Sequence, residues 1–142
     1  MNNKQRIFVV DDERIIAQTI AMILRWQGFV VESFTDPIEA LEASRVQAPD
    51  LLVTDIWMQV LSGIDLAIQV RKGCPNIKVL LLSGQAETSK MREKFREDGQ
   101  EFDLLLKPIH PRELLSRVHW RLELDSDQAD LPHAASGSTY AI

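Results

Sequence analysis

The chain of 142 residues carries a net charge of −5 at neutral pH, with 45% hydrophobic and 26% charged residues. A chain of this length corresponds to one domain and buries enough surface to fold without disulfides or a structural metal. The composition excludes collagen-like, disulfide-rich and disordered proteins. The acidic balance excludes the basic surface of an autonomous nucleic-acid binder, so we expect no direct contact with nucleic acid.

Two further features concern the location of the protein. Apolar runs such as residues 7–10 and 79–82 extend over only four residues, whereas a membrane span needs about 20 and a signal-peptide core at least about 7. Cys74 is the single cysteine, so no internal disulfide is possible and a reducing compartment suits the chain. The sequence predicts a cytoplasmic protein that does not insert into a membrane.

The first part of the chain alternates between strand and helix patterns. Residues 6–10 form a short β-branched run that predicts a strand, and residues 29–34 form a second one. Between them, residues 13–26 have apolar side chains at helical spacing, and Gly28 follows as a stop signal. These patterns predict a strand–helix–strand unit.

The middle of the chain repeats this alternation. Asp36 and Pro37 are typical of a helix N-cap and of the first helical position, so they predict the start of a second helix. Residues 51–56 predict a buried strand because they begin with an uninterrupted apolar run. The helical spacing of residues 64–72, followed by Gly73, predicts a third helix.

The last part of the chain contains two expected strands, residues 77–83 and 102–106, each followed by a helical pattern. The helix expected at residues 86–98 has a narrow apolar stripe, so we expect it to pack weakly and to be the most mobile of the five. Residues 111–124 predict a fifth helix with a broader apolar face. Residues 125–142 contain three aspartates and no Lys or Arg, and predict a disordered acidic tail.

Five strand–helix units in alternation predict an α/β fold, with a parallel sheet covered by helices on both faces. In such a sheet the carboxyl ends of the strands share one edge, where ligands bind. The polar side chains that follow the expected strands at this edge are Asp11, Asp12, Asp55, Ser83 and Lys107. We therefore expect three carboxylates, one hydroxyl and one amine to converge from four strand ends.

Charge constrains what this cluster can do. Three neighbouring aspartates repel one another, so the group is expected to retain a proton or to bind a cation such as Mg²⁺. A lysine on the opposite side suits phosphate oxygens. Together these groups indicate an aspartyl-phosphate site with one carboxylate as nucleophile. Simpler interpretations exist: Asp11 and Asp12 as caps of the first helix, and Ser83 as part of a turn.

Four motifs occur in order at these strand ends: IFVVDDE at 7–13, LLVTDIWMQVLSG at 51–63, VLLLSG at 79–84 and LLLKP at 104–108. Together they resemble the receiver domain of two-component response regulators. The resemblance covers residues 5–124 and implies a doubly wound, flavodoxin-like sheet of five strands in the order 2-1-3-4-5. It implies one receiver domain at 5–124, followed by the tail at 125–142 and with no output domain expected.

The resemblance also implies a metal site. Asp55 would be the phosphoacceptor and a ligand of Mg²⁺. Asp12 would bind the ion directly and Asp11 mostly through water, with the backbone carbonyl of Trp57 as a further ligand. The expected cofactor is therefore Mg²⁺.

The resemblance implies a switch on the opposite side of the phosphoacceptor. Ser83 would hydrogen-bond one phosphoryl oxygen and Lys107 would pair with another, with the Lys107–Pro108 bond in the cis form. Phosphorylation would draw Ser83 towards the phosphate and shift the fourth helix and fifth strand. Family members often bind partners through the fourth helix, fifth strand and fifth helix, which implies a homodimer or a downstream protein target at that face.

Some positions depart from the family pattern. Leu104 stands where the family usually has Tyr or Phe, and Phe102 is an aromatic residue that could take over from a shifted position. Gln59 replaces a familiar proline, and Trp57 places a bulky side chain beside the phosphoacceptor. The leucine triplet 104–106 allows two interpretations. We expect all three side chains to be buried in a covered sheet; the alternative is that one is exposed as a contact surface.

The expected function is a signalling switch rather than a turnover enzyme. The chain would accept a phosphoryl group on Asp55 from a sensor histidine kinase, a phosphotransfer protein or a small phosphodonor, and lose it to water. The alternative is an interaction module on the same fold that works without phosphate. A metal-dependent phosphatase also forms an aspartyl phosphate, but it needs an acid two positions after the nucleophile, where this chain has Trp57.

Overall fold

The computed structural model describes residues 4–84, 102–123 and 142. Its elements follow in the order β1 (Arg6–Val10), α1 (Arg14–Trp26), β2 (Val30–Phe34), α2 (Pro37–Val46), β3 (Leu51–Asp55), α3 (Gly63–Gly73), β4 (Lys78–Ser83), β5 (Asp103–Leu106) and α5 (Pro111–Leu122). The five strands and three of the helices are confirmed within two residues of their predicted bounds, and the second helix begins at Pro37 as predicted. The helix expected at 86–98, and the expected tail up to residue 141, lie outside the described residues.

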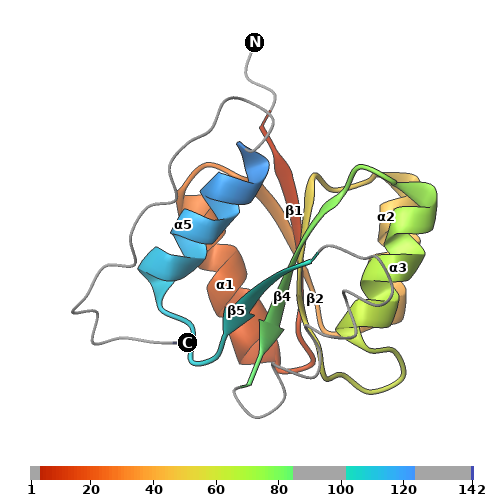
Figure 1. Ribbon diagram of the computed structural model, residues 1–142, viewed down its shortest axis with the longest axis horizontal. Helices are drawn as coiled ribbons and strands as arrows, with labels where there is room; N and C mark the ends of the chain where they lie inside the picture. The colour runs from red at the N-terminus through yellow and green to blue at the C-terminus, as the bar shows by residue number, and fades with distance from the viewer. Residues whose placement is uncertain (1–3, 85–101, 124–141) are drawn as a thin grey trace.

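The five strands form one sheet in the order β2-β1-β3-β4-β5, and every neighbouring pair is parallel. Helices α1 and α5 cover one face, and α2 and α3 lie on the other (Figure 1). This arrangement confirms the predicted doubly wound α/β fold and its strand order. Because all strands run in one direction, their carboxyl ends lie along the same edge of the sheet.

The sheet separates two apolar cores. Along β1, Ile7 and Val9 belong to the core under α1 and α5, whereas Phe8 and Val10 belong to the core under α2 and α3. This alternation is the period of two that side chains follow along any strand. Every residue of β3 is buried, as expected for a central strand with helices on both faces. The site at the end of β3 is therefore supported by a strand that is buried along its whole length.

Local signals in the sequence set the ends of the helices. Gly28, after α1, has a φ of +96°, a conformation that favours glycine. The Asp36 side chain accepts a hydrogen bond from the Ile38 N–H at 2.9 Å, and the Ser62 hydroxyl accepts one from the Asp65 N–H at 3.1 Å. These bonds cap α2 and α3. In the described part of the chain, no helix has both the length and the apolar character that a membrane crossing requires.

The edge strand β5 departs from one expectation. Leu104 and Leu105 are buried on opposite faces of the sheet, but Leu106 is 39% exposed. The expectation that all three leucines are buried is therefore wrong. The reason is position: α3 packs against β3 and β4, whereas Leu106 is the last residue of a strand at the sheet edge.

Candidate functional site

Asp55 is the last residue of β3, the central strand of the sheet. The strand pairs with β1 on one side and β4 on the other, and Asp55 lies in register with Leu82. Asp55 is only 7% exposed. The strand therefore holds this carboxylate in a fixed and nearly buried position at the carboxyl edge of the sheet.

Asp11 and Asp12 follow β1, the strand next to β3. Asp11 is fully buried and its Oδ1 accepts a hydrogen bond from the Glu13 N–H at 2.9 Å, whereas Asp12 is exposed. The N-cap residue of α1 is Glu13. Asp11 thus fixes the turn that leads into α1, but neither aspartate occupies the cap position that the simpler interpretation assigned to them.

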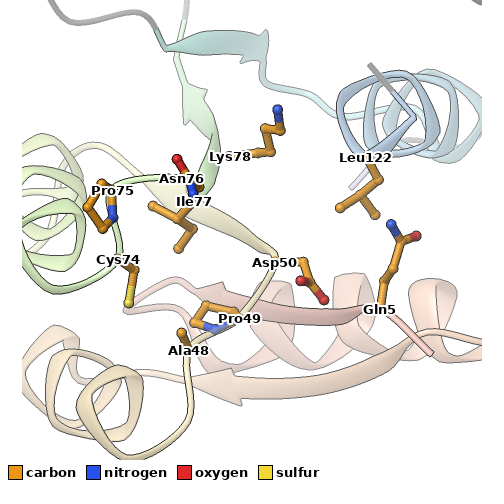
Figure 2. Close-up of a pocket in the computed structure, with 10 residues that line it drawn as sticks. All are labelled: Gln5, Ala48, Pro49, Asp50, Cys74, Pro75, Asn76, Ile77, Lys78 and Leu122. Atoms are coloured by element: carbon orange, nitrogen blue, oxygen red, sulfur yellow. The ribbon is translucent and has the colours of Figure 1, made fainter. Parts of the chain in front are cut away.

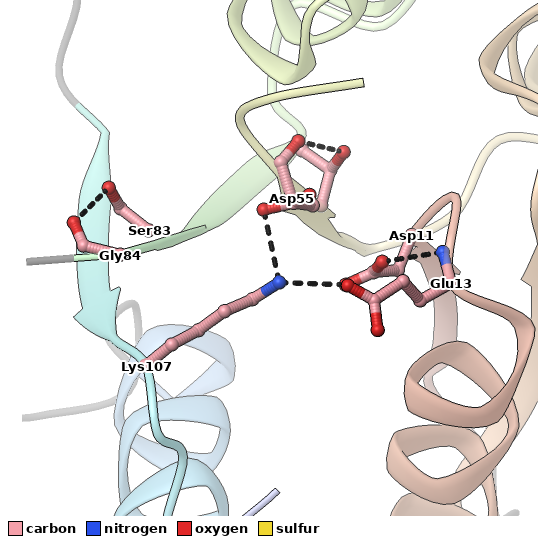
Figure 3. A network of polar contacts seen from close by, with 7 residues as sticks. Asp11, Glu13, Asp55, Ser83, Gly84 and Lys107 are labelled. Carbon is pink, nitrogen blue, oxygen red and sulfur yellow. Dashed lines mark hydrogen bonds and ion pairs between the residues drawn. The ribbon is translucent and has the colours of Figure 1, made fainter. Parts of the chain in front are cut away.

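Lys107 brings a positive charge to this edge from the end of β5. Its N–H donates to the Ser83 carbonyl oxygen at 2.7 Å, and the Lys107–Pro108 bond is cis, as the resemblance implied. Its Nζ lies 3.2 Å from Asp11 Oδ2 and 3.3 Å from Asp55 Oδ1 (Figure 3). One ammonium group therefore joins the carboxylates that follow β1 and end β3.

Asp11, Asp12 and Asp55 form a compact cluster of oxygens. One carboxylate oxygen from each lies within 4.8 Å of the other two. Mg²⁺ binds oxygens at about 2.0–2.1 Å and usually takes one or two carboxylates, with water or phosphate oxygens in its other positions. The donor atoms are of the type that Mg²⁺ prefers, and small side-chain adjustments would bring them to that spacing. The three residues therefore fit the expected ion.

Burial dominates the electrostatics of the cluster. Loss of solvation raises the pKa of the Asp11 carboxyl above its ordinary 3.8, against the opposing effects of the Glu13 N–H and Lys107. Burial also raises the pKa of Asp55 above 3.8, against Lys107 and with added repulsion from Asp11. Burial acts to lower the pKa of Lys107, but the attraction of Asp11 and Asp55 outweighs it and the net direction is upward. A cation would relieve the unfavourable charge on both aspartates.

Ser83 and Trp57 complete the set of residues that the sequence singled out. Ser83, the last residue of β4, is fully buried, and its hydroxyl donates to the Gly84 carbonyl oxygen at 2.9 Å. Figure 3 shows this hydroxyl turned towards Gly84 rather than towards Asp55. The Trp57 side chain is 55% exposed. The structure thus brings Asp11, Asp55 and Lys107 into contact, while the roles assigned to the Ser83 hydroxyl and the Trp57 carbonyl stay predictions.

Two residues that follow Asp55, Val60 in the loop and Gly63 at the start of α3, have backbone conformations or contacts for which the sequence predicted no role. The Gly63 N–H donates to the Ile56 carbonyl oxygen at 2.8 Å, and a Cβ at Gly63 would overlap the backbone oxygen of Asp55. Only glycine permits this close approach of α3 to β3. Val60 has a φ of +75°, a left-handed conformation that strains a β-branched residue. The Ser62-Gly63 pair in the motif pointed to a special backbone position at Gly63. No feature of the sequence pointed to the left-handed conformation of Val60.

Phe102 and Leu104 lie in the same core layer, two residues apart before Lys107. The guanidinium of Arg71 on α3 lies 4.5 Å from the centre of the Phe102 ring, a cation–π distance. The Phe102 ring therefore lies on the same side of the sheet as Leu104, but two residues farther from Lys107 in the sequence. Its role as a substitute switch residue stays a prediction.

Two surface cavities lie away from the acidic cluster. One, of about 380 Å³, is lined by residues that include Asp50, Cys74 and Lys78 (Figure 2). Asp50 precedes β3 and Lys78 begins β4, so this cavity lies at the amino ends of the strands. A second cavity, of about 470 Å³, is lined by α2 and α3 and shares Ala48 and Cys74 with the first. Neither includes a residue of the cluster around Asp55.

The sequence matches the family described as the response regulator receiver domain over residues 7–119, which is most of the chain. The chain belongs to this family. The receiver domain is 32% identical over 125 residues to the DNA-binding response regulator MtrA of Mycolicibacterium paratuberculosis, covering 88% of this chain and 54% of MtrA. It is 33% identical over 118 residues to the transcriptional regulatory protein CreB of Escherichia coli, covering 81% of this chain and 49% of CreB. The chain thus spans about half the length of these curated relatives.

Solved structures agree with this assignment. The receiver domain of NtrX from Brucella abortus superposes with a TM-score of 0.74 at 32% identity, covering 82% of this chain and 98% of that one. A putative response regulator from Chloroflexus aurantiacus gives a TM-score of 0.74 at 30% identity, covering 84% of this chain and 98% of that one. Each of these solved chains is matched over nearly its full length by this receiver domain.

The raised pKa values of Asp11 and Asp55 predict how stability depends on pH without metal. The folded state binds these protons more tightly than the unfolded state, so the free energy of unfolding falls as pH rises from about 3.8 through the raised values. We expect Asp55→Asn to be more stable than the wild type at pH 7 in a chelator, and this advantage to shrink towards pH 4. Chemical denaturation at several pH values measures both.

A matched control is Asp65→Asn, which neutralises an exposed carboxylate in the first turn of α3. This variant should show no gain in stability at pH 7. Addition of Mg²⁺ should stabilise the wild type and reduce the advantage of Asp55→Asn. A lower stability of Asp55→Asn at pH 7 in the chelator would contradict the account of a strained, desolvated cluster.

Proposed function

We propose that this receiver domain is a phosphorylation-dependent switch that accepts a phosphoryl group on Asp55 in the presence of Mg²⁺. The observation that carries the proposal is the Lys107 ammonium, 3.2 Å from Asp11 and 3.3 Å from Asp55. It stands beside a cluster of three carboxylates that fits a divalent cation. A nucleophile, a cation site and a phosphate-binding amine are thus assembled at one point. We further propose that a sensor kinase or a phosphotransfer protein supplies the phosphoryl group. We also propose that the protein is cytoplasmic.

The proposed reaction is a phosphoryl transfer from a phosphohistidine. An Asp55 carboxylate oxygen attacks phosphorus, the phosphorus–nitrogen bond breaks, and its electron pair leaves with the imidazole of the donor. Asp11, Asp12 and Asp55 would hold Mg²⁺, which when bound supplies positive charge to the phosphoryl oxygens. Lys107 pairs with one of these oxygens, and water later hydrolyses the acyl phosphate. The chain returns to its starting state without turning over a substrate of its own.

The signal would come from the change of partners around Lys107. An acyl phosphate on Asp55 carries more negative charge than the carboxylate, so it draws Lys107 away from Asp11. The Ser83 hydroxyl, now bonded to Gly84, would turn to a phosphoryl oxygen. Because the Lys107 N–H is bonded to the Ser83 carbonyl, the ends of β4 and β5 would move together. The exposed Leu106 at the end of β5 supports a contact of this face with a downstream protein or a second copy.

The most direct test of the acceptor is labelling with acetyl phosphate and Mg²⁺, followed by intact-protein mass spectrometry. The wild type should gain a hydroxylamine-sensitive adduct of about 80 Da. Asp55→Asn should gain none, and its circular dichroism should match the wild type. An adduct on Asp55→Asn would place the acceptor elsewhere. Absence of any adduct on the wild type, with Mg²⁺ binding confirmed, would favour the alternative of an interaction module that works without phosphate.

An exposed apolar stripe on α1 supports a helical partner as phosphodonor. Ile15 is 79% exposed, Met22 48% and Trp26 76%. With Thr19 between them, their spacing of three or four residues places them on one side of the helix. The buried residues of α1, such as Ile20 and Leu24, face the core on the other side. The Ile15–Trp26 stripe extends about 16 Å along the helix, from its first turn to its last residue.

The position of the stripe links it to Asp55. Helix α1 begins at Arg14, two residues after Asp12, so Ile15 lies close to the acidic cluster. Exposed apolar surface of this kind is typical of a protein contact. A phosphodonor helix that lies along the stripe would therefore reach the edge of the sheet at which Asp55 ends β3. Small phosphodonors need no such contact.

This difference gives a prediction for Trp26→Ala. Loss of a large contact residue should slow transfer from a cognate phosphohistidine protein by about tenfold, because an aromatic side chain buried in an interface often contributes at least that much to binding. Labelling by acetyl phosphate should stay at the wild-type rate. The matched control is Val46→Ala, which removes a 90% exposed side chain from α2 in the other helix layer. Equal effects of Trp26→Ala on both donors, or none on either, would contradict a docking role for the stripe.

A further inference from the structure

Ile142, the last residue of the sequence, lies against the junction between β5 and α5. Figure 1 shows the C-terminus beside the loop that joins these two elements. The Ile109 N–H donates to a backbone oxygen of Ile142 at 2.9 Å, and the Ile142 N–H donates to the Ile109 carbonyl oxygen at 2.6 Å. This mutual exchange is the pattern of a hydrogen-bonded pair in antiparallel strands. Ile142 therefore binds the Ile109 backbone as one residue of an added strand would.

The pair also provides hydrogen-bond partners for buried backbone groups of Ile109. Ile109 is fully buried, so its backbone N–H and carbonyl must find partners. Strand β5 ends at Leu106 and α5 begins at Pro111, and Ile142 supplies both partners of Ile109. Ile142 packs against the core under α1 and α5. This core includes Ile109 and Leu114. The backbone hydrogen bonds and the apolar contacts thus favour an extended apolar residue at the position beside Ile109. We call this position the seat.

The seat lies two residues after Lys107. At one end of this short stretch, the Lys107 Nζ contacts Asp11 and Asp55, and its N–H is bonded to the Ser83 carbonyl oxygen. At the other end, Ile109 is bonded to Ile142. The stretch between Lys107 and Ile109 is therefore held from both sides.

We propose that Ile142 is the occupant of a regulatory seat at Ile109, and that this Ile142–Ile109 clip stabilises the position of Lys107 seen with unmodified Asp55. Phosphorylation of Asp55 moves Lys107 and loosens the clip. The clip stands on the observed bonds, whereas its coupling to Asp55 rests on the proposed function.

The connection permits an intramolecular contact. Helix α5 has 12 residues and is about 18 Å long, and 18 residues separate Glu123 from Ile142. A chain of that length easily spans the helix. The hydrogen bonds and apolar contacts of Ile142 outweigh the entropy of closing such a loop only modestly. The clip is therefore closed in the unmodified chain and opens when its seat is disturbed.

The test of the clip is the hydrogen-exchange rate of the Ile109 amide, measured by NMR in the full chain. Ile142→Asp places a charge in the apolar seat and should speed this exchange by about tenfold. Ile142→Val should keep the wild-type rate. The matched control is Val46→Asp, the same kind of change at an exposed position of α2, and the amide of Val53 in β3 reports whether each variant is folded. Equal Ile109 exchange in the wild type and Ile142→Asp overturns the clip.

The coupling is measured on the same amide after phosphorylation with acetyl phosphate and Mg²⁺, with the modified fraction read from the intact mass. Ile109 exchange should become about tenfold faster in the phosphorylated wild type, and should not change in Asp55→Asn under the same conditions. Unchanged exchange in a phosphorylated sample overturns the coupling alone. Failure to form any adduct overturns the proposed function and the coupling with it, while exchange in the unmodified chain still decides the clip.

Discussion

The Lys107 ammonium stands between two buried carboxylates, and the arrangement of the site depends on this contact. Its Nζ reaches Asp11 and Asp55 from a third strand end, and its backbone is bonded to a fourth through Ser83. A buried carboxylate without a partner is strongly unfavourable, and one ammonium shared by two carboxylates only partly relieves this. The raised pKa values of Asp11 and Asp55 express the remaining imbalance. A divalent cation held by these carboxylates would supply positive charge that Lys107 alone does not provide.

The parallel sheet explains why these charges can be held so close together. Strands β1, β3, β4 and β5 lie next to one another in the sheet in that order, and their carboxyl ends lie along one edge. Each side chain follows or ends a strand whose other residues are packed between helix layers, so the packing energy of the cores holds the charges in place. Gly63 adds a further constraint, because α3 approaches the backbone of Asp55 too closely for any side chain at that position. The unfavourable cluster is thus supported by the rest of the fold.

The fold, and the side chains that meet at the strand ends, could be predicted from the sequence for clear physical reasons. Apolar runs and apolar spacing identified the described elements other than α2, whose start was predicted from Asp36 and Pro37. These two residues and Gly28 marked helix ends because caps and left-handed turns need particular residues. The strand ends identified Asp11, Asp55 and Lys107 as neighbours because parallel topology brings those ends together. What periodicity could not predict depends on tertiary neighbours: the exposure of Leu106 at the sheet edge, the turn of the Ser83 hydroxyl to Gly84, and the pairing of Ile142 with Ile109.

In the proposed switch, Lys107 exchanges a carboxylate partner for a phosphoryl oxygen. A crystal structure of the full chain with Mg²⁺ and beryllofluoride, a stable mimic of the phosphoryl group, measures this exchange directly. We expect beryllofluoride on Asp55, a fluorine atom within about 3 Å of Lys107 Nζ, and an Nζ–Asp11 distance longer than the present 3.2 Å. A structure with Mg²⁺ and beryllofluoride bound at Asp55, but with Lys107 still in contact with Asp11 and turned away from the fluorine atoms, would contradict the proposed switch.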